Sequence, residues 1–197
     1  MMTSQSLSSD EQMLSLTVRW LERAVIGLNL CPFAKSVHVK GQIHYRLSHS
    51  TQKQELLQVL QEELQALQAT DPAVRDTTLL VLPDCFPDFL DFNDFLQDAD
   101  DVLYTLGLDG TLQIASFHPR FQFAGTTEDD ITNFTNRAPF PVLHLIREAS
   151  IARAVEAFPD AEMIYEKNMR TLEDLGRAGW KELGLEIERE QDAEGQA

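Results

Sequence analysis

The sequence predicts a single α/β domain with a small, mostly parallel sheet of three or four strands and helices packed on it. Apolar runs typical of buried strands alternate with amphipathic stretches in the middle of the chain. That alternation favours parallel pairing through right-handed crossovers. The chain has 197 residues and is 43% hydrophobic, which is enough for one ample core. A ferredoxin-like α+β sheet is the main alternative.

The first helices and strands are predicted from the spacing of apolar residues and from the residues that interrupt helices. Apolar side chains of residues 10–28 fall mostly at helical spacing, which predicts a helix with Asp10 as its N-cap. Pro32 makes the next segment irregular, because proline disfavours helical backbone in the residue before it. A strand is expected at 42–47, and leucines on one face predict a helix at 51–69.

The later elements begin with a near-continuous apolar run at 77–82, which predicts a buried strand. An amphipathic helix is expected at 88–106 and a strand at 111–116. The run at 142–146 follows two prolines, and a short helix is favoured over a fourth strand because proline is tolerated in a first helical turn. Two more helices are expected, at 150–158 and 161–177.

Residues 10–185 are expected to form the domain, with 1–9 as a disordered leader and 186–197 as a charged, flexible tail. The leader lacks the basic and apolar regions of a secretory signal, and no apolar run is long enough to span a membrane. Cys31 and Cys85 do not resemble a disulfide framework, so a reducing cytoplasm is the expected location.

The formal net charge of -16 bears on the partners. A chain this acidic repels phosphate backbones and anionic membrane surfaces, so neither nucleic acid nor membrane is an expected partner. A small anionic molecule is compatible with this charge if a few cations converge in a cleft, because they can outweigh the distant field.

The strongest functional signal is the stretch 117–125, which places His118, Arg120 and Gln122 among three aromatic residues directly after a strand. Side chains two apart in an extended segment point the same way. A histidine beside a permanent cation suits proton transfer on an anionic substrate, with the arginine as the clamp. The alternative is that His118 binds a local carbonyl and Arg120 pairs with a surface carboxylate.

A parallel sheet would bring residues from other loops close to this stretch. In a parallel sheet the carboxyl ends of the strands meet at one edge, where ligands bind. The ends that would meet carry Ser48 and His49, Asp84 and Cys85, and His118 and Arg120.

Cys31 is the candidate nucleophile, provided that a cation brought near by the fold lowers its pKa. The competing interpretation is a small buried hydrophobe, and Cys85, beside carboxylates, is expected to be structural. No metal-binding motif occurs, although a composite site of Cys31, His118 and a carboxylate stays open. No nucleotide-binding motif occurs either, and the sequence leaves the cofactor unknown.

Further candidate substrate-binding residues lie in two polar segments. Asn136 and Arg137 precede two prolines, and Asn168 and Arg170 lie in the last long helix. The two arginines could complete an anion site with Arg120. The simpler alternative for Arg170 is a helical ion pair with the glutamate four residues earlier.

Four separated motifs resemble an uncharacterised bacterial family, the domain of unknown function number 1415. The motifs are 29–34 (NLCPFA), 118–123 (HPRFQF), 136–141 (NRAPFP) with 143–145 (LHL), and 165–168 (YEKN). The resemblance covers about residues 16–176 and implies no reaction or cofactor. One departure is Ala138, where a serine is expected, which removes a helix N-cap.

Three functional hypotheses follow. The first is an enzyme, a hydrolase or transferase, that acts on a small anionic metabolite with His118 as acid or base and Cys31 as nucleophile. The second is a non-catalytic accessory protein whose acidic helix, with Asp91, Asp94 and Asp98, docks a basic partner. A metal or redox carrier using Cys31 and His118 ranks last, because two protein ligands rarely suffice.

Overall fold

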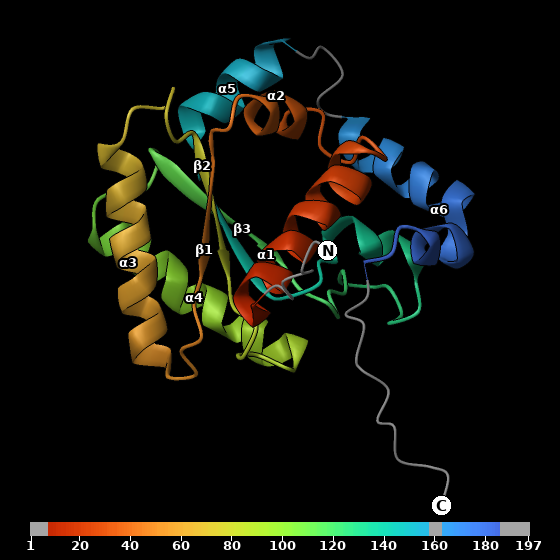
Figure 1. Cartoon of the computed structure of the whole chain (residues 1–197), viewed down its shortest axis with the longest axis horizontal. Helices are drawn as coiled ribbons and strands as arrows, with labels where there is room; N and C mark the ends of the chain where they lie inside the picture. The colour runs from red at the N-terminus through yellow and green to blue at the C-terminus, as the bar shows by residue number, and fades with distance from the viewer. Residues whose placement is uncertain (1–7, 158–162, 186–197) are drawn as a thin grey trace, which may run out of the picture.

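A four-stranded sheet in the spatial order β1-β2-β4-β3 forms the middle layer between two layers of helices (Figure 1). The computed structural model describes residues 8–157 and 163–185. The expected leader therefore falls mostly, and the expected tail entirely, outside the described residues.

The sheet is mixed. β1 (Ile43–Leu47) pairs parallel to β2 (Thr77–Val81), whereas β4 (Val142–Arg147) pairs antiparallel to β2 and to β3 (Leu112–Phe117). The prediction of a mostly parallel sheet is therefore wrong, and the parallel β1–β2 pair also excludes the antiparallel ferredoxin-like alternative.

The error arises at β4, which was expected to be a helix. Its residues Val142, Leu143 and Leu145 are all buried, because helices cover both faces of the sheet. A strand buried on both faces is a short continuous apolar run, and periodicity cannot distinguish such a run from a buried helical segment. Pairing on both sides, with β2 and with β3, decides for the strand.

The strand ends nevertheless meet as predicted. Because β4 runs opposite to both of its neighbours, β3 points in the same direction as β2 and β1. Leu47 lies beside Val81, and Val81 and Phe117 both lie beside Val142, so the three carboxyl ends share one edge of the sheet. The polar loops that follow these strands therefore lie together.

One face of the sheet is covered by α3 (Lys53–Ala69) and α4 (Phe89–Thr105). Leucines at helical spacing on α3 pack with aromatic residues of α4 and with the sheet. The fully buried members of this core include Leu56, Leu60, Leu64, Leu67, Leu80, Phe92, Leu143 and Leu145.

The other face is covered by α1 (Ser9–Trp20), which continues as the π-helical turn η1 (Leu21–Ile26) and packs Trp20 and Ala24 into a second core. Ser8, not Asp10, caps α1 and forms a capping box with Glu11. Ser8 and Ser9, expected in the leader, therefore belong to this helix.

Three further helices and one 3-10 turn complete this layer. They are α2 (Ala34–Val39), in a segment expected to be partly irregular, η2 (Ile131–Asn136), α5 (Glu148–Ala157) and α6 (Ile164–Glu182). The φ of Gly176 is 63°, a left-handed conformation that favours glycine, and it kinks α6.

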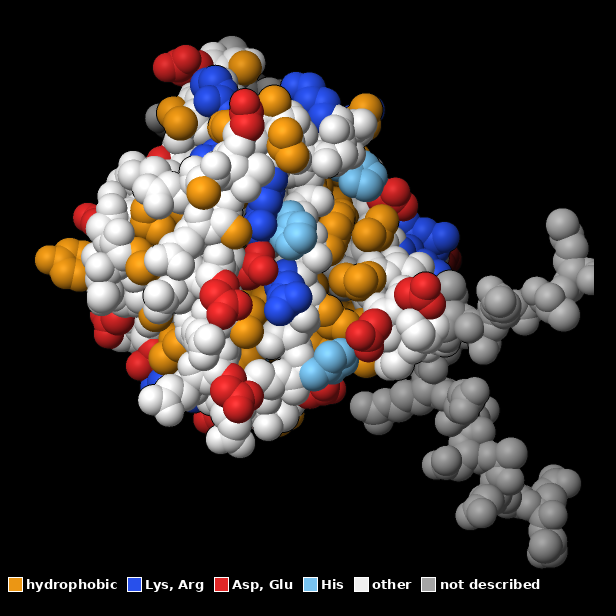
Figure 2. All heavy atoms as spheres, turned by 60° about the vertical axis from the view of Figure 1, so that its left-hand side comes forward, with side chains coloured by type: hydrophobic (Ala, Val, Ile, Leu, Met, Phe, Trp, Pro, Cys, Tyr) orange, Lys and Arg blue, Asp and Glu red, His pale blue; other side chains and the backbone are white. Residues whose placement is uncertain are grey.

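No helix in the described ranges is long and apolar enough to cross a membrane. Figure 2 shows that acidic side chains on one face of the molecule are scattered among basic, histidine and apolar side chains. On this face the negative charge is thus dispersed and forms no single acidic patch.

Candidate functional site

His118 is a core residue, 1% exposed. Its Nδ1 accepts a hydrogen bond from the backbone N–H of Arg120 at 3.0 Å, so Nε2 carries the proton and donates to the carbonyl of Phe86 at 2.8 Å. The ring also packs on Phe89 and Phe92 of α4. Burial lowers the pKa of His118. Both nitrogens are thus occupied inside the protein, which favours the structural interpretation over acid–base chemistry.

Arg120 and Gln122 make local contacts. The guanidinium of Arg120 is exposed and lies 3.7 Å from Asp88 and 3.5 Å from Glu128. The Gln122 amide donates to the carbonyl of Thr126 at 2.6 Å. The alternative in which Arg120 pairs with surface carboxylates is confirmed.

Asn136 and Arg137 lie beside the same loop and hold it in place. Asn136 Nδ2 donates to the carbonyl of Ser116 at 3.2 Å, and Arg137 Nε donates to the carbonyl of Phe121 at 3.2 Å. The Arg137 guanidinium also lies 4.3 Å from the centre of the Phe134 ring. The structure thus brings two predicted motifs together, with the contacts of a scaffold.

Asn168 and Arg170 lie in the same helix but make unrelated contacts. Asn168 is buried, and its Nδ2 donates to the carbonyl of Leu30 at 2.9 Å, which ties α6 to the segment before Cys31. Arg170 is exposed and lies 3.7 Å from Glu166, as the simpler alternative predicted. Within the described ranges, Arg170 shares no hydrogen-bond or ion-pair partner with Arg120 or Arg137.

Cys31 is half-buried and packs with the core on the α1 side of the sheet. Burial raises the pKa of its thiol, while hydrogen bonds from the backbone N–H groups of Phe33 and Ala34, at the start of α2, act in the opposite direction. His118 instead packs on α4, on the other side. In the part of the chain that the structure describes, no three His, Cys, Asp or Glu side chains are placed to hold a metal ion.

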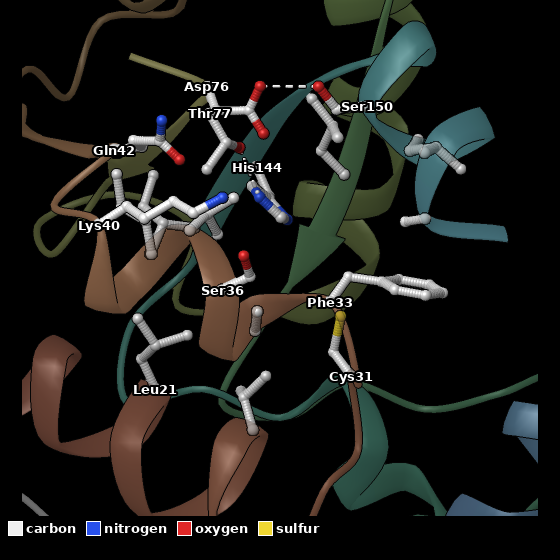
Figure 3. A pocket seen from close by; sticks show the side chains of 18 of the residues that line it. Leu21, Cys31, Phe33, Ser36, Lys40, Gln42, Asp76, Thr77, His144 and Ser150 are labelled. Carbon is white, nitrogen blue, oxygen red and sulfur yellow. Dashed lines mark hydrogen bonds between the residues drawn. The ribbon is translucent and has the colours of Figure 1, made fainter. Parts of the chain in front are cut away.

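Cys31 lines a cavity that sequence analysis did not anticipate. The cavity has a volume of about 580 Å³ and lies between the sheet, η1, α2 and α5. Such a volume lies within the range of small-molecule sites. Figure 3 labels eight of the polar side chains around it, which are Cys31, Ser36, Lys40, Gln42, Asp76, Thr77, His144 and Ser150. Arg153 lines the cavity as well. Most of the remaining wall is apolar, including Leu21, Val25, Val37, Ile43, Ile146 and Ile151.

His144 projects from β4 into this cavity (Figure 3). Its Nε2 lies 2.7 Å from Thr77 Oγ1, and that hydroxyl lies 2.6 Å from the carbonyl of Leu145. His144 is half-buried, and burial lowers its pKa to about 4. A histidine inside the apolar run 142–146 was the available signal, and it was missed because the segment was taken for a helix.

Two ends of the cavity differ in charge. Asp76 accepts a hydrogen bond from Ser150 Oγ at 2.7 Å, and Arg153 donates to the same hydroxyl at 2.8 Å, so this acid is already partnered. The Lys40 side chain reaches in from the opposite wall, toward His144 (Figure 3). Among residues 8–157 and 163–185, no carboxylate pairs with Lys40.

Comparison with known proteins identifies a family and no function. A family model described as "Protein of unknown function (DUF1415)" matches residues 12–182. Neither the curated proteins nor the solved structures include a match.

Proposed function

The chain belongs to the DUF1415 family, whose description assigns no activity, and we propose that it binds a small amphipathic anion in the cavity between the sheet, α2 and α5. The observation that supports this proposal most directly is an ammonium group without a carboxylate partner, that of Lys40, at a mostly apolar cavity. The proposal keeps the small anionic ligand expected from the sequence and moves it away from His118.

Charge balance supports an anionic head group. The chain has 32 acidic and 16 basic residues, so a lysine has many potential partners. Lys40 instead lies at the cavity, where the nearest acid of the lining, Asp76, is bonded to Ser150 on the opposite side. Lys40 is exposed at the rim of the cavity, so an anion beside it would gain a charge-assisted hydrogen bond of modest strength.

The apolar wall supports an apolar body. Side chains of η1, α2, the sheet and α5 surround the space, and each buried CH₂ of a ligand contributes about 0.8 kcal/mol there. Binding to such a site is expected to need an alkyl or aryl group in addition to the charge.

The test uses Trp20, which lines the cavity, as the reporter. The chain has two tryptophans, so Trp180→Phe leaves Trp20 as the sole tryptophan. Octanoate and 3-phenylpropanoate are expected to give saturable changes in Trp20 emission, and octan-1-ol and octylamine weaker ones. Saturation by none of these probes, or equal binding of the acid, alcohol and amine, would contradict the proposal.

Matched lysine variants locate the charge. Lys40→Met keeps the apolar stem and is expected to weaken octanoate binding about fivefold, the factor for about 1 kcal/mol. Lys35 lies in α2, is exposed as Lys40 is, and does not line the cavity, so Lys35→Met is expected to leave binding unchanged. Equal effects of the two variants would place the anion elsewhere.

An enzyme that uses Cys31 on the bound anion is the second candidate function, favoured by the position of this thiol in the same cavity wall. Backbone N–H groups of Phe33 and Ala34 point at its sulfur, although burial keeps the thiol protonated near neutral pH. In a Cys85→Ser background, alkylation of Cys31 by iodoacetamide is expected to be slow, and slower still with octanoate. Fast, thiolate-like alkylation near neutral pH would move the nucleophile hypothesis ahead of simple binding.

A further inference from the structure

Resting on the proposed function, we infer that the cavity prefers acids that carry a hydroxyl group close to the carboxylate over the corresponding unsubstituted and oxo acids. The inference concerns His144, Thr77 and Lys40, which together determine what a head group must donate and accept. It deepens the proposed site from an amphipathic anion to a hydroxy acid.

The tautomer of His144 follows from its partner. Thr77 Oγ1 has one proton, and its distance of 2.6 Å from the Leu145 carbonyl requires that proton to lie between the two oxygens. The contact of 2.7 Å between Thr77 Oγ1 and His144 Nε2 must therefore be donated by Nε2–H. In a neutral imidazole with the proton on Nε2, the other nitrogen, Nδ1, is an acceptor.

That acceptor belongs to the cavity. Within the described residues no hydrogen-bond partner is found for Nδ1, and it is not among the fully enclosed polar atoms that lack a partner. An unsatisfied acceptor in a mostly apolar site favours a ligand that donates to it and disfavours one that places a carbonyl oxygen there. A hydroxyl donates to such an acceptor, whereas an oxo group cannot.

The position of Lys40 implies that the hydroxyl group of the ligand lies close to its carboxylate. The Lys40 side chain and the His144 ring point toward one another across the same part of the cavity (Figure 3). A carboxylate at Lys40 therefore brings its own neighbouring carbons toward His144, and the apolar tail extends along the remaining wall. A hydroxyl at the far end of the tail would not meet the imidazole.

The test compares octanoate with 2-hydroxyoctanoate, 3-hydroxyoctanoate and 2-oxooctanoate, with Trp20 as the reporter in the Trp180→Phe protein. At least one hydroxy acid is expected to bind about tenfold more tightly than octanoate, and the oxo acid more weakly. His144→Phe is expected to remove the hydroxyl preference and still bind octanoate. His38→Phe, a histidine paired with Glu22 outside the cavity, should keep the preference.

Thr77→Val supplies a second variant if the phenylalanine substitution unfolds the protein. It preserves shape, frees His144 Nε2 and is expected to reduce the preference by allowing either tautomer. Equal binding of octanoate and both hydroxy acids to the parent protein would overturn the inference. A preference that survives unchanged in His144→Phe, or in Thr77→Val where His144→Phe does not fold, would overturn it as well. Failure of every acid to bind would instead overturn the proposed function.

Discussion

Replacing His118 with asparagine tests the role of this residue in the fold. The shorter side chain cannot both accept from Arg120 and donate to Phe86, and it loses the ring contacts with α4. We expect the free energy of unfolding to fall by about 2 to 3 kcal/mol, measured by urea denaturation. His38→Asn, which alters a partly exposed pair with Glu22, should change it by less than about 0.5 kcal/mol. An unchanged stability in His118→Asn would restore the acid–base hypothesis.

At the scale of single residues, the sequence showed which residues are important, but it did not show whether they stabilise the fold or act on a substrate. A histidine and an arginine after a strand have the same sequence pattern whether their nitrogens meet a substrate or a backbone carbonyl. The carbonyl of Phe86 comes from the loop before α4, and only the tertiary structure brings it to His118. The surroundings of Cys31 were not predictable for a similar reason. The N–H groups that reach its sulfur lie at the start of α2, and Pro32 had led us to expect an irregular segment there.

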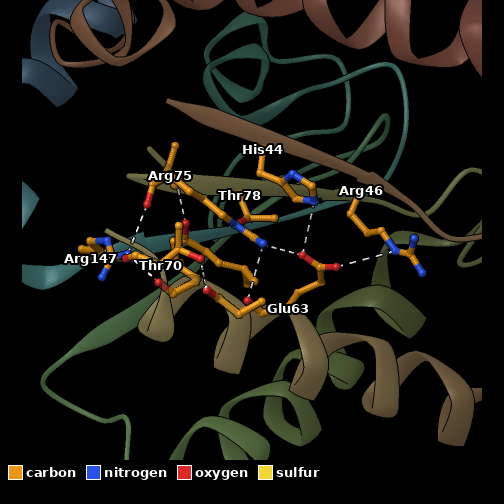
Figure 4. A network of polar contacts seen from close by, with 11 residues as sticks. His44, Arg46, Glu63, Thr70, Arg75, Thr78 and Arg147 are labelled. Carbon is orange, nitrogen blue, oxygen red and sulfur yellow. Dashed lines mark hydrogen bonds and ion pairs between the residues drawn. The ribbon is translucent and has the colours of Figure 1, made fainter. Parts of the chain in front are cut away.

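At the scale of elements, Arg147 joins β4 to the end of α3 (Figure 4). Its Nη2 donates to the carbonyls of Leu67 and, at 2.6 Å, Thr70, which lie where α3 leaves carbonyls without helical partners, and to that of Arg75 at 3.1 Å. A cation at a helix C-terminus also interacts favourably with the helix dipole.

Arg147→Met is expected to lower the free energy of unfolding by about 2 kcal/mol, because buried carbonyls lose a charged donor. Arg147→Lys should recover part of this loss. Arg46→Met is the matched control, since Arg46 is half-exposed, 3.7 Å from Glu63, and its removal should cost at most about 0.5 kcal/mol. Equal effects of the Arg147 and Arg46 substitutions would show that Arg147 does not stabilise the end of α3.

Helices with a strong hydrophobic periodicity were predictable from the sequence, whereas the order in which the strands pair in the sheet was not. The leucine face of α3 and the amphipathic face of α4 gave both helices nearly to their observed ends. β4 has no such period, and its insertion between β2 and β3 changes a parallel sheet into a mixed one. Because β4 was expected to be a helix, the role of His144 at the centre of the proposed site was missed as well.

For the whole molecule, histidine titration predicts how stability depends on pH. Burial lowers the pKa of His44, His118 and His144, whereas a hydrogen bond to Asp84 raises that of His49. A lowered pKa means that the unfolded chain binds more protons, so stability rises with pH between the folded and unfolded values. A raised pKa has the opposite sign, and its contribution is lost as pH rises through the folded value.

The lowered values are expected to dominate, so the protein should become less stable from pH 6.5 down to pH 4. The pKa of His144 falls from 6.5 to about 4, and this change alone corresponds to roughly 3 kcal/mol. Urea denaturation at several pH values gives the slope directly. His144→Gln should flatten it, while His49→Gln should leave it nearly unchanged in this range, because the raised pKa of His49 makes its contribution vary only above pH 6.5. A stability that is flat over this range in the parent protein would mean that His144 is already accessible to protons in the folded state, and the neutral acceptor in the cavity would then be absent at mildly acid pH.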